Sequence, residues 1–160
     1  MKLLIAVFLI VLCLPLRGEQ GSCPNTDFAA DELIARWNKN ATDHKFSDWL
    51  LKKYNGLGFI RQQLGKSGLL MVGHVDKHRC VTRLEIKSRR ADTVGYAGLV
   101  GWLWLIDATN PTASKEQRHE VFTALGLDQP KAGGSFKLGR VTYEFSEDEE
   151  INDFLAVPNP

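Results

Sequence analysis

The amino-acid sequence predicts an α+β fold, in which helices pack mainly on one face of an antiparallel sheet. Two segments, 69–86 and 136–145, each contain short apolar or alternating runs on either side of a turn, which is typical of a β-hairpin. Stretches with the apolar spacing of helices precede both segments. Because hairpins give antiparallel pairing, we expect a sheet of about four strands (two hairpins) covered by about four helices.

The first expected helix begins after 25–27, an Asn-Thr-Asp triplet whose side chains can cap backbone N–H groups. Apolar residues then recur with the spacing of one helix face, at Ala30, Leu33, Ile34, Trp37 and Ala41. A second, shorter helix is expected over 47–54, with Gly56 as its left-handed stop. The segment 59–64 is ambiguous between helix and strand.

The first hairpin consists of an apolar run at 69–72, a polar turn at 76–79 and an alternating run at 81–86. Successive side chains of a strand point to opposite faces. The alternation sets Val81, Arg83 and Glu85 against Thr82, Leu84 and Ile86. This second strand is expected to end near Lys87.

The third expected helix covers 94–106, which contains no charged residue, and a helix of this kind is buried on several sides. Its glycines recur at every third position, at Gly95, Gly98 and Gly101. They would let another backbone approach closely, and Trp102 and Trp104 are expected in the core. A strand over 102–105 is the competing assignment, but the length of the uncharged stretch favours a helix.

A fourth helix is expected to begin at Ser114, which can form a capping box with Gln117, and to end near Leu125 before Gly126. Two further strands follow within 136–145, joined by a glycine turn. An acidic stretch and a short apolar segment close the chain and receive no assignment.

The N-terminus has the features of a secretory signal, because one basic residue, Lys2, precedes an uninterrupted apolar run over 3–16. We predict a signal segment over 1–20, cut between positions 18 and 22, and then a single globular domain over 21–160. An uncleaved membrane anchor is the alternative, although the run is shorter than the roughly 20 residues that span a bilayer. The protein is therefore expected to be exported, to the periplasm or the extracellular space.

Two cysteines remain after the signal, Cys23 and Cys80. In an oxidising compartment such a pair is expected to form a disulfide. By restricting the unfolded chain, this disulfide would stabilise the folded state by roughly 4 kcal/mol. The alternative is a reactive thiol at Cys80 with His78 as its base, which requires both groups to be held in place.

The charge of the domain is nearly balanced, because the signal removes Lys2 and Arg17 from a chain with 20 basic and 19 acidic residues. A balanced charge gives no overall attraction for nucleic acid. Contact with a membrane is expected only through an uncleaved signal segment.

His74, Asp76 and His78 are spaced by two, so on one continuous strand they would share a face and could bind a metal. They span the expected hairpin turn, however, where polar residues are common, so neither a metal nor a cofactor is expected. The sequence lacks Gly-x-Ser-x-Gly, His-Glu-x-x-His and a phosphate-binding glycine loop, which favours a non-catalytic protein over an enzyme. Asn40 begins an Asn-x-Thr sequon, an acceptor of glycan only in a eukaryotic source.

A basic group surrounds the end of the first hairpin, with Arg83, Lys87, Arg89 and Arg90. It is either a solvated strand end, whose ion pairs add little stability, or a charged docking surface. The second interpretation predicts a small exported protein that binds another protein, as an inhibitor or an immunity-type factor does. Two alternatives stay open: a carrier of a small apolar or aromatic ligand, with a pocket beneath the helix around 96–104, and a hydrolase with an unassigned site.

Overall fold

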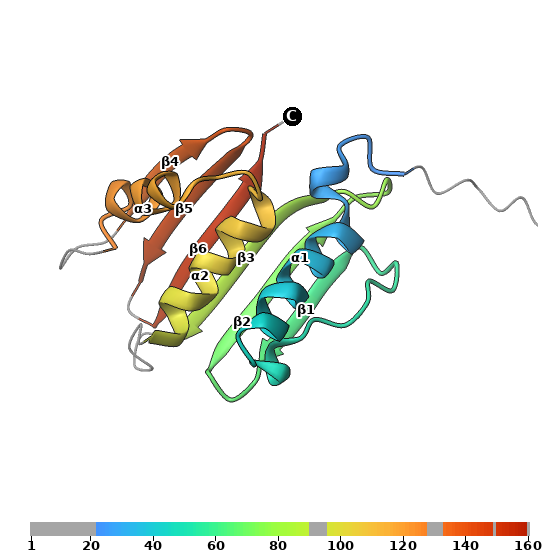
Figure 1. Ribbon diagram of the computed structural model, residues 1–160, viewed down its shortest axis with the longest axis horizontal. Helices are drawn as coiled ribbons and strands as arrows, with labels where there is room; N and C mark the ends of the chain where they lie inside the picture. Colours follow the sequence, from blue (N-terminus) through green and yellow to red (C-terminus); the bar gives the residue numbers. More distant parts are fainter. Residues whose placement is uncertain (1–21, 90–95, 128–132, 149, 160) are drawn as a thin grey trace, which may run out of the picture.

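The computed structural model describes residues 22–89, 96–127, 133–148 and 150–159 of the chain (Figure 1). It contains one antiparallel sheet of six strands in the order β1-β2-β3-β6-β5-β4. The strands are β1 Phe59–Leu64, β2 Leu69–Val75, β3 Val81–Arg89, β4 Gly134–Leu138, β5 Val141–Glu147 and β6 Ile151–Pro158. The helices are α1 Ala30–Asp43, α2 Tyr96–Thr109 and α3 Lys115–Ala124, with two 3-10 turns, η1 Thr26–Phe28 and η2 Ser47–Trp49.

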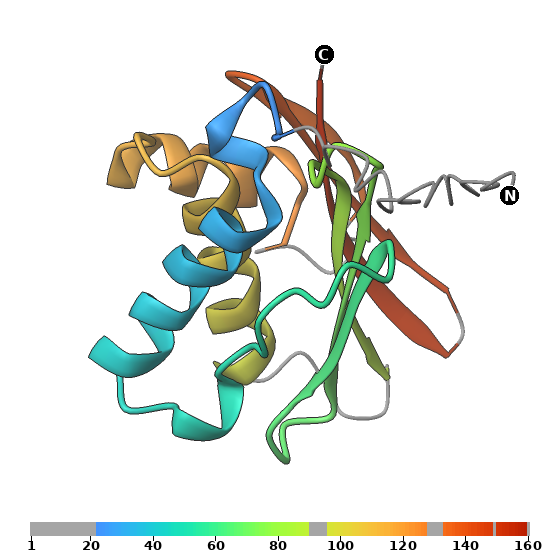
Figure 2. The ribbon, with the colours of Figure 1, turned by 90° about the vertical axis from the view of Figure 1, so that its right-hand side faces the viewer.

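The described helices lie on one face of the sheet, as Figure 2 shows, and this confirms the predicted α+β class. The order of the strands is symmetric about the centre of the sheet, where β3 pairs with β6. Each of these two strands ends one half of the chain. The first half has one helix, α1, before β1, β2 and β3, and the second half has α2 and α3 before β4, β5 and β6.

The expected numbers of four strands and four helices are wrong, because the described chain has six strands and three α-helices. Strand β1 lies at an edge of the sheet and buries only Ile60 and Leu64, so its apolar alternation is weak. Strand β6 is central and buries Phe154, Leu155 and Ala156 in succession, so its sequence does not alternate at all.

The predicted helix over 47–54 is limited to the three-residue turn η2. The chain after it is held extended by the side chain of Asn38 on α1. The backbone N–H of Leu51 donates to Asn38 Oδ1 at 2.6 Å, and Asn38 Nδ2 donates to the carbonyl of Leu51 at 2.9 Å. Because these backbone groups are already bonded to Asn38, they are not available to continue a helix.

Both predicted hairpins are present, as β2 with β3 and β4 with β5. The first contains an irregularity that the sequence did not indicate: Val75 pairs with Val81 but His74 pairs with Arg83, which leaves Thr82 as an extra residue. The extra residue turns Val81 into the core, where it is 1% exposed, while Arg83 is exposed. Val81 and Arg83 therefore do not share a face, contrary to the simple alternation.

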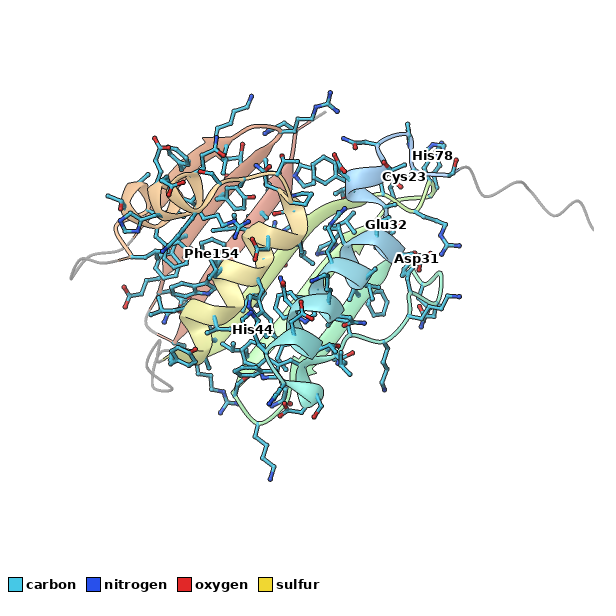
Figure 3. The ribbon with its side chains drawn as sticks, viewed as in Figure 1. Cys23, Asp31, Glu32, His44, His78 and Phe154 are labelled. Carbon is cyan, nitrogen blue, oxygen red and sulfur yellow. A yellow bond between two sulfur atoms is a disulfide. The ribbon has the colours of Figure 1, made fainter. Side chains whose placement is uncertain are left out.

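The core between α1, α2 and the sheet is built around tryptophan rings. Trp37 of α1 stacks on Trp49 at 6.3 Å and meets the edge of Trp104 at 5.5 Å. His44, which follows α1, stacks on Trp104 at 5.6 Å and is labelled beside α2 in Figure 3. On the other side of α2, Trp102 stacks on Phe154 of β6 at 5.5 Å. The expected burial of Trp102 and Trp104 is confirmed.

Helix α2 lies close to the sheet because Gly101 has no side chain. A Cβ at this position would come within 3.2 Å of Leu69 Cδ1 and 3.3 Å of Ile86 Cδ1. The close approach that the glycine spacing predicts is therefore to side chains of β2 and β3, not to another backbone. Helix α2 is buried on several sides, as expected, because it packs against α1 and the sheet, but one stripe that includes Tyr96 and Leu103 is exposed.

The capping predictions for α3 are confirmed. Ser114 accepts a hydrogen bond from the backbone of Gln117, and Gln117 Oε1 accepts one from the backbone of Ser114 at 2.8 Å. Gly126 has a φ of 65°, the left-handed conformation expected after the C-terminus of a helix.

A disulfide joins Cys23 to Cys80, as predicted, and it ties the start of the described chain to the turn between β2 and β3. Figure 3 shows Cys23 and His78 at the same corner of the molecule. The backbone of Ala30 donates to the carbonyl of Arg79 at 3.0 Å, so α1 begins against this turn. The predicted signal segment lies outside the described residues, and none of the described helices is long and apolar enough to cross a membrane.

Candidate binding site

The helix-free face of the sheet carries a row of charged residues along β3. Leu84 and Ile86 of this strand are buried in the core, and the Cδ1 atom of Ile86 faces α2. The intervening residues therefore point away from the helices. These residues are Arg83, Glu85, Lys87 and Arg89.

Glu85 is only 3% exposed, although it lies on the face without helices. The register places it between Val72 of β2 and Leu155 of β6, whose apolar side chains flank the carboxylate. The carboxylate is balanced by Lys87 at 2.9 Å and by Arg83 at 3.3 Å. It is thus a charged group withdrawn from water and paired with two cations, as a buried charge requires.

Asp153 of β6 belongs to the same network, because the register sets it directly opposite Lys87. Lys87 Nζ donates to Asp153 Oδ2 at 2.9 Å, so this ammonium group bridges two carboxyl groups. His74 of β2 comes to 3.9 Å from Glu85, but its side chain is 57% exposed. Arg83, Glu85 and Lys87 of β3 and Asp153 of β6 thus form one ionic cluster, although Asp153 is far from the others in the chain.

The pKa values of the two carboxyl groups move in opposite directions. Burial of Glu85 raises its pKa, but the hydrogen bonds from Lys87 and Asp153 and the charges of Lys87 and Arg83 outweigh burial and leave this pKa below its ordinary value. For Asp153, burial raises the pKa, and the hydrogen bond to Lys87 only partly opposes it. Glu85 therefore carries the negative charge of the pair, and Asp153 binds a proton more readily than an ordinary aspartate.

A pocket of about 790 Å³ opens beside this cluster, near the end of β3. We call it the basic pocket, because three of the described residues that line it are cationic and none of these described residues is acidic. Its lining comprises Arg61, Gln62, Gln63, Gly68, Leu70, Lys87, Ser88, Arg89 and Ile151. Lys87 is held by its two carboxyl partners, whereas Arg61 and Arg89 make no ion pair with any described residue. The pocket therefore presents two guanidinium groups whose charges are not neutralised by the described chain.

The structure brings together only part of the basic group predicted from sequence. Lys87 and Arg89 line the basic pocket, whereas Arg83 lies further along β3 beside Glu85, and Arg90 is outside the described residues. Arg61 was missed, because the segment 59–64 received no assignment. The alternation of Ile60 and Leu64 with polar residues is the signal that could have placed Arg61 on the polar face of a strand.

The candidate metal ligands are not assembled into a site. Asp76 Oδ1 accepts backbone N–H groups of His78 and Cys80, each at 2.8 Å, so this carboxylate stabilises the turn. His74 lies near Glu85 instead. Among the described residues no group of three histidine, cysteine, aspartate or glutamate side chains could hold a metal ion. Asn40, the possible glycan acceptor, lies within α1, and its amide donates to Asp107 of α2 at 3.4 Å.

Comparison with known proteins adds nothing to this picture. No family model, no curated protein and no solved structure matches the chain. A fold alone does not determine a function.

Replacement of Lys87 by methionine is expected to lower the free energy of unfolding by about 2 kcal/mol at pH 7. Removal of one partner from a buried ion pair costs about 3–5 kcal/mol, and the Lys87 side chain is 33% exposed, which reduces this cost. Urea denaturation measures the change. Lys137→Met, on exposed β4, is the matched control and should change stability by less than about 0.5 kcal/mol.

The loss in Lys87→Met should depend on pH. A lowered pKa of Glu85 contributes stability above the ordinary pKa of glutamate, 4.5, and this contribution is lost as the pH falls below it. The raised pKa of Lys87 contributes stability below 10.5. The difference between Lys87→Met and the original protein should therefore be largest between these values and shrink in acid. A difference that stays constant down to about pH 3 would contradict the ionic role of Glu85.

Proposed function

We propose that this protein is an exported, non-catalytic binding protein that docks an acidic segment of another protein in the basic pocket. The observation that carries the proposal is the pair Arg61 and Arg89, two arginines without a carboxylate partner among the described residues, lining one pocket of about 790 Å³. A guanidinium group binds a carboxylate through two parallel hydrogen bonds, so unpaired arginines favour an acidic ligand.

The apolar content of the pocket supports a peptide-like occupant. Leu70 and Ile151 contribute apolar surface between the cations, and Ile151 is 38% exposed. Complementary charge around such a surface increases the rate of association and selects the partner. Because the charge of the whole chain is nearly balanced, an acidic ligand is attracted by the cations of the pocket and not by the protein as a whole.

The chemistry of the pocket supports binding over catalysis. Lys87 would be the only candidate base among the described residues of its lining, but two carboxyl groups raise the pKa of Lys87 against the effect of burial, so it stays protonated. A general base needs a pKa near the working pH. His74 and Glu85, the histidine–carboxylate contact that could favour a hydrolase, are not among the residues that line the pocket.

The proposal is tested with a fluorescent peptide of ten glutamates, and with a matched lysine peptide as the negative ligand. At low salt the glutamate peptide should bind the purified protein saturably, and Arg61→Glu combined with Arg89→Glu should weaken binding at least tenfold. Lys52→Glu combined with Lys53→Glu changes the net charge equally at exposed positions outside the pocket. This control should weaken binding less than twofold.

Two outcomes would overturn the proposal. Equal losses in the two double variants would show that only net charge attracts the peptide. If the glutamate peptide shows no saturable binding at low salt, the basic pocket has no affinity for carboxylates. If the peptide binds as expected, the same variants can identify the natural partner in extracts of the compartment to which the protein is exported. The partner should be captured by the original protein and by the Lys52/Lys53 variant, but not by the Arg61/Arg89 variant.

A further inference from the structure

A second, separate surface lies in the helix layer, between α2 and α3. Four residues of α2 form its first wall with the spacing of one helix face: Tyr96, Leu99, Val100 and Leu103. Phe122 of α3 and Leu127 form the second wall. We call this feature the helix groove; its volume is about 730 Å³.

The helix groove concentrates exposed apolar surface. Seven large apolar residues of the described chain are exposed, and three of them, Tyr96 at 76%, Leu99 at 40% and Leu103 at 38%, line this one groove. Contiguous apolar surface of this kind on a folded protein marks a place where something binds.

The charged or titratable residues that α3 contributes to the described groove lining are basic. Lys115, Arg118 and His119 of α3 line it together with the apolar residues, and no acidic residue is among the described residues of its lining. Arg118 is engaged by Asp107 at 2.8 Å, whereas Lys115 and His119 have no ion-pair partner among the described residues. The groove thus combines an apolar wall with cationic groups along one side, which is complementary to an anionic amphiphile.

The size of the groove favours a small molecule over a folded protein. Its described lining comprises ten residues, whereas a stable protein interface uses about 20–30 residues on each side. Its volume lies within the range of small-molecule sites, roughly 300–1,000 Å³. The apolar stripe from Tyr96 to Leu103 extends about 10 Å along the helix axis, which suits an elongated chain.

From these observations we infer that the helix groove binds a straight-chain carboxylate, with the alkyl chain along α2 and the carboxylate near Lys115 and His119. The predicted pocket beneath the helix is replaced by a groove beside it, because Gly101 brings the underside of α2 against Leu69 and Ile86. The inference is independent of the proposed function, since the basic pocket lies on the opposite face of the sheet.

Calorimetric titration of the purified protein with decanoate tests the inference. We expect saturable binding of one decanoate per chain, and decyltrimethylammonium, which has the same chain and the opposite charge, should bind at least tenfold more weakly. Lys115→Glu should lower the affinity for decanoate at least fivefold and reduce the preference for the anionic amphiphile over the cationic one.

The apolar wall is tested by Leu99→Asp combined with Leu103→Asp, which should lower the affinity for decanoate at least twentyfold. Both residues are exposed, so the fold should persist, and circular dichroism checks this. The matched control is Leu57→Asp, because Leu57 is 64% exposed and lies outside the groove. This variant should bind decanoate as tightly as the original protein does.

Several results would overturn the inference. The first is that decanoate does not bind saturably at millimolar concentration. The second is that decanoate and decyltrimethylammonium bind with equal affinity. The third is that the Leu99/Leu103 variant binds decanoate as tightly as the original protein does. A dimer that is lost in that variant would show that a second copy of the chain, not an amphiphile, occupies the groove.

Discussion

Replacement of both Cys23 and Cys80 by serine is expected to lower the free energy of unfolding by about 4 kcal/mol. The disulfide closes a loop with a sequence separation of 57, and it restricts the unfolded chain in proportion to the logarithm of that length. Loss of the restriction stabilises the unfolded state. The same corner holds Ala30 and Arg79 by hydrogen bonding, so the native contacts of α1 should survive.

Guanidinium denaturation with and without a reducing agent measures this effect. The original protein should lose about 4 kcal/mol when it is reduced, and the double serine variant should not respond to the reductant. Equal stability of the oxidised original protein and the variant would contradict the prediction. The single variants Cys23→Ser and Cys80→Ser should match the double variant, because either one removes the bridge.

Replacement of Trp37 by alanine is expected to lower the free energy of unfolding by about 4 kcal/mol, since a buried tryptophan truncated to alanine typically costs 3–5 kcal/mol. Trp37 is 1% exposed and contacts the rings of Trp49 and Trp104. Its indole Nε1 also donates to the carbonyl of Trp49 at 2.8 Å in a buried position. The variant loses both the packing and the donor for that carbonyl.

The two contributions can be separated by Trp37→Phe, which keeps an aromatic ring but lacks the indole donor. This variant should cost about 1–3 kcal/mol, the penalty for a buried carbonyl without a partner. Leu57→Ala, at an exposed leucine, is the control and should change stability by less than about 0.5 kcal/mol. A loss in Trp37→Ala no larger than in the control would show that the tryptophan cluster does not support the core.

Elements with strong local signals were predictable from the sequence. The capping box of Ser114 and Gln117 located the start of α3, and the long uncharged stretch identified α2 against the competing strand. These signals depend on neighbours within one or two turns of the chain. They are therefore visible without knowledge of the tertiary structure.

Elements whose signals depend on the position of a strand within the sheet were not predictable. Strand β1 is polar because it forms an edge, and β6 does not alternate because it is central. The order of the strands is set by long-range packing. For the same reason the sequence did not place Arg61 beside Arg89, although both residues line one pocket.

The burial of Glu85 was also beyond the sequence. Its place in the alternation of β3 indicates an exposed side chain, but the register places it between Val72 and Leu155 of the two neighbouring strands, and it is buried. The basic pocket was predicted in part, through Lys87 and Arg89. The cluster that orients Lys87 emerged only with the register that sets Asp153 opposite it.

The symmetric order of the sheet has a consequence for the folding pathway. Pairs within each half, β1 with β2 and β4 with β5, join segments that are close in the chain, so they can form early and at a small cost in loop closure. The pairing of β3 with β6 joins the two halves across most of the domain. Because closing so long a loop is costly, we expect this central seam to form last, after the rate-limiting step of folding. Substitutions at Ile86 or Phe154 should then mainly accelerate unfolding and leave the folding rate nearly unchanged.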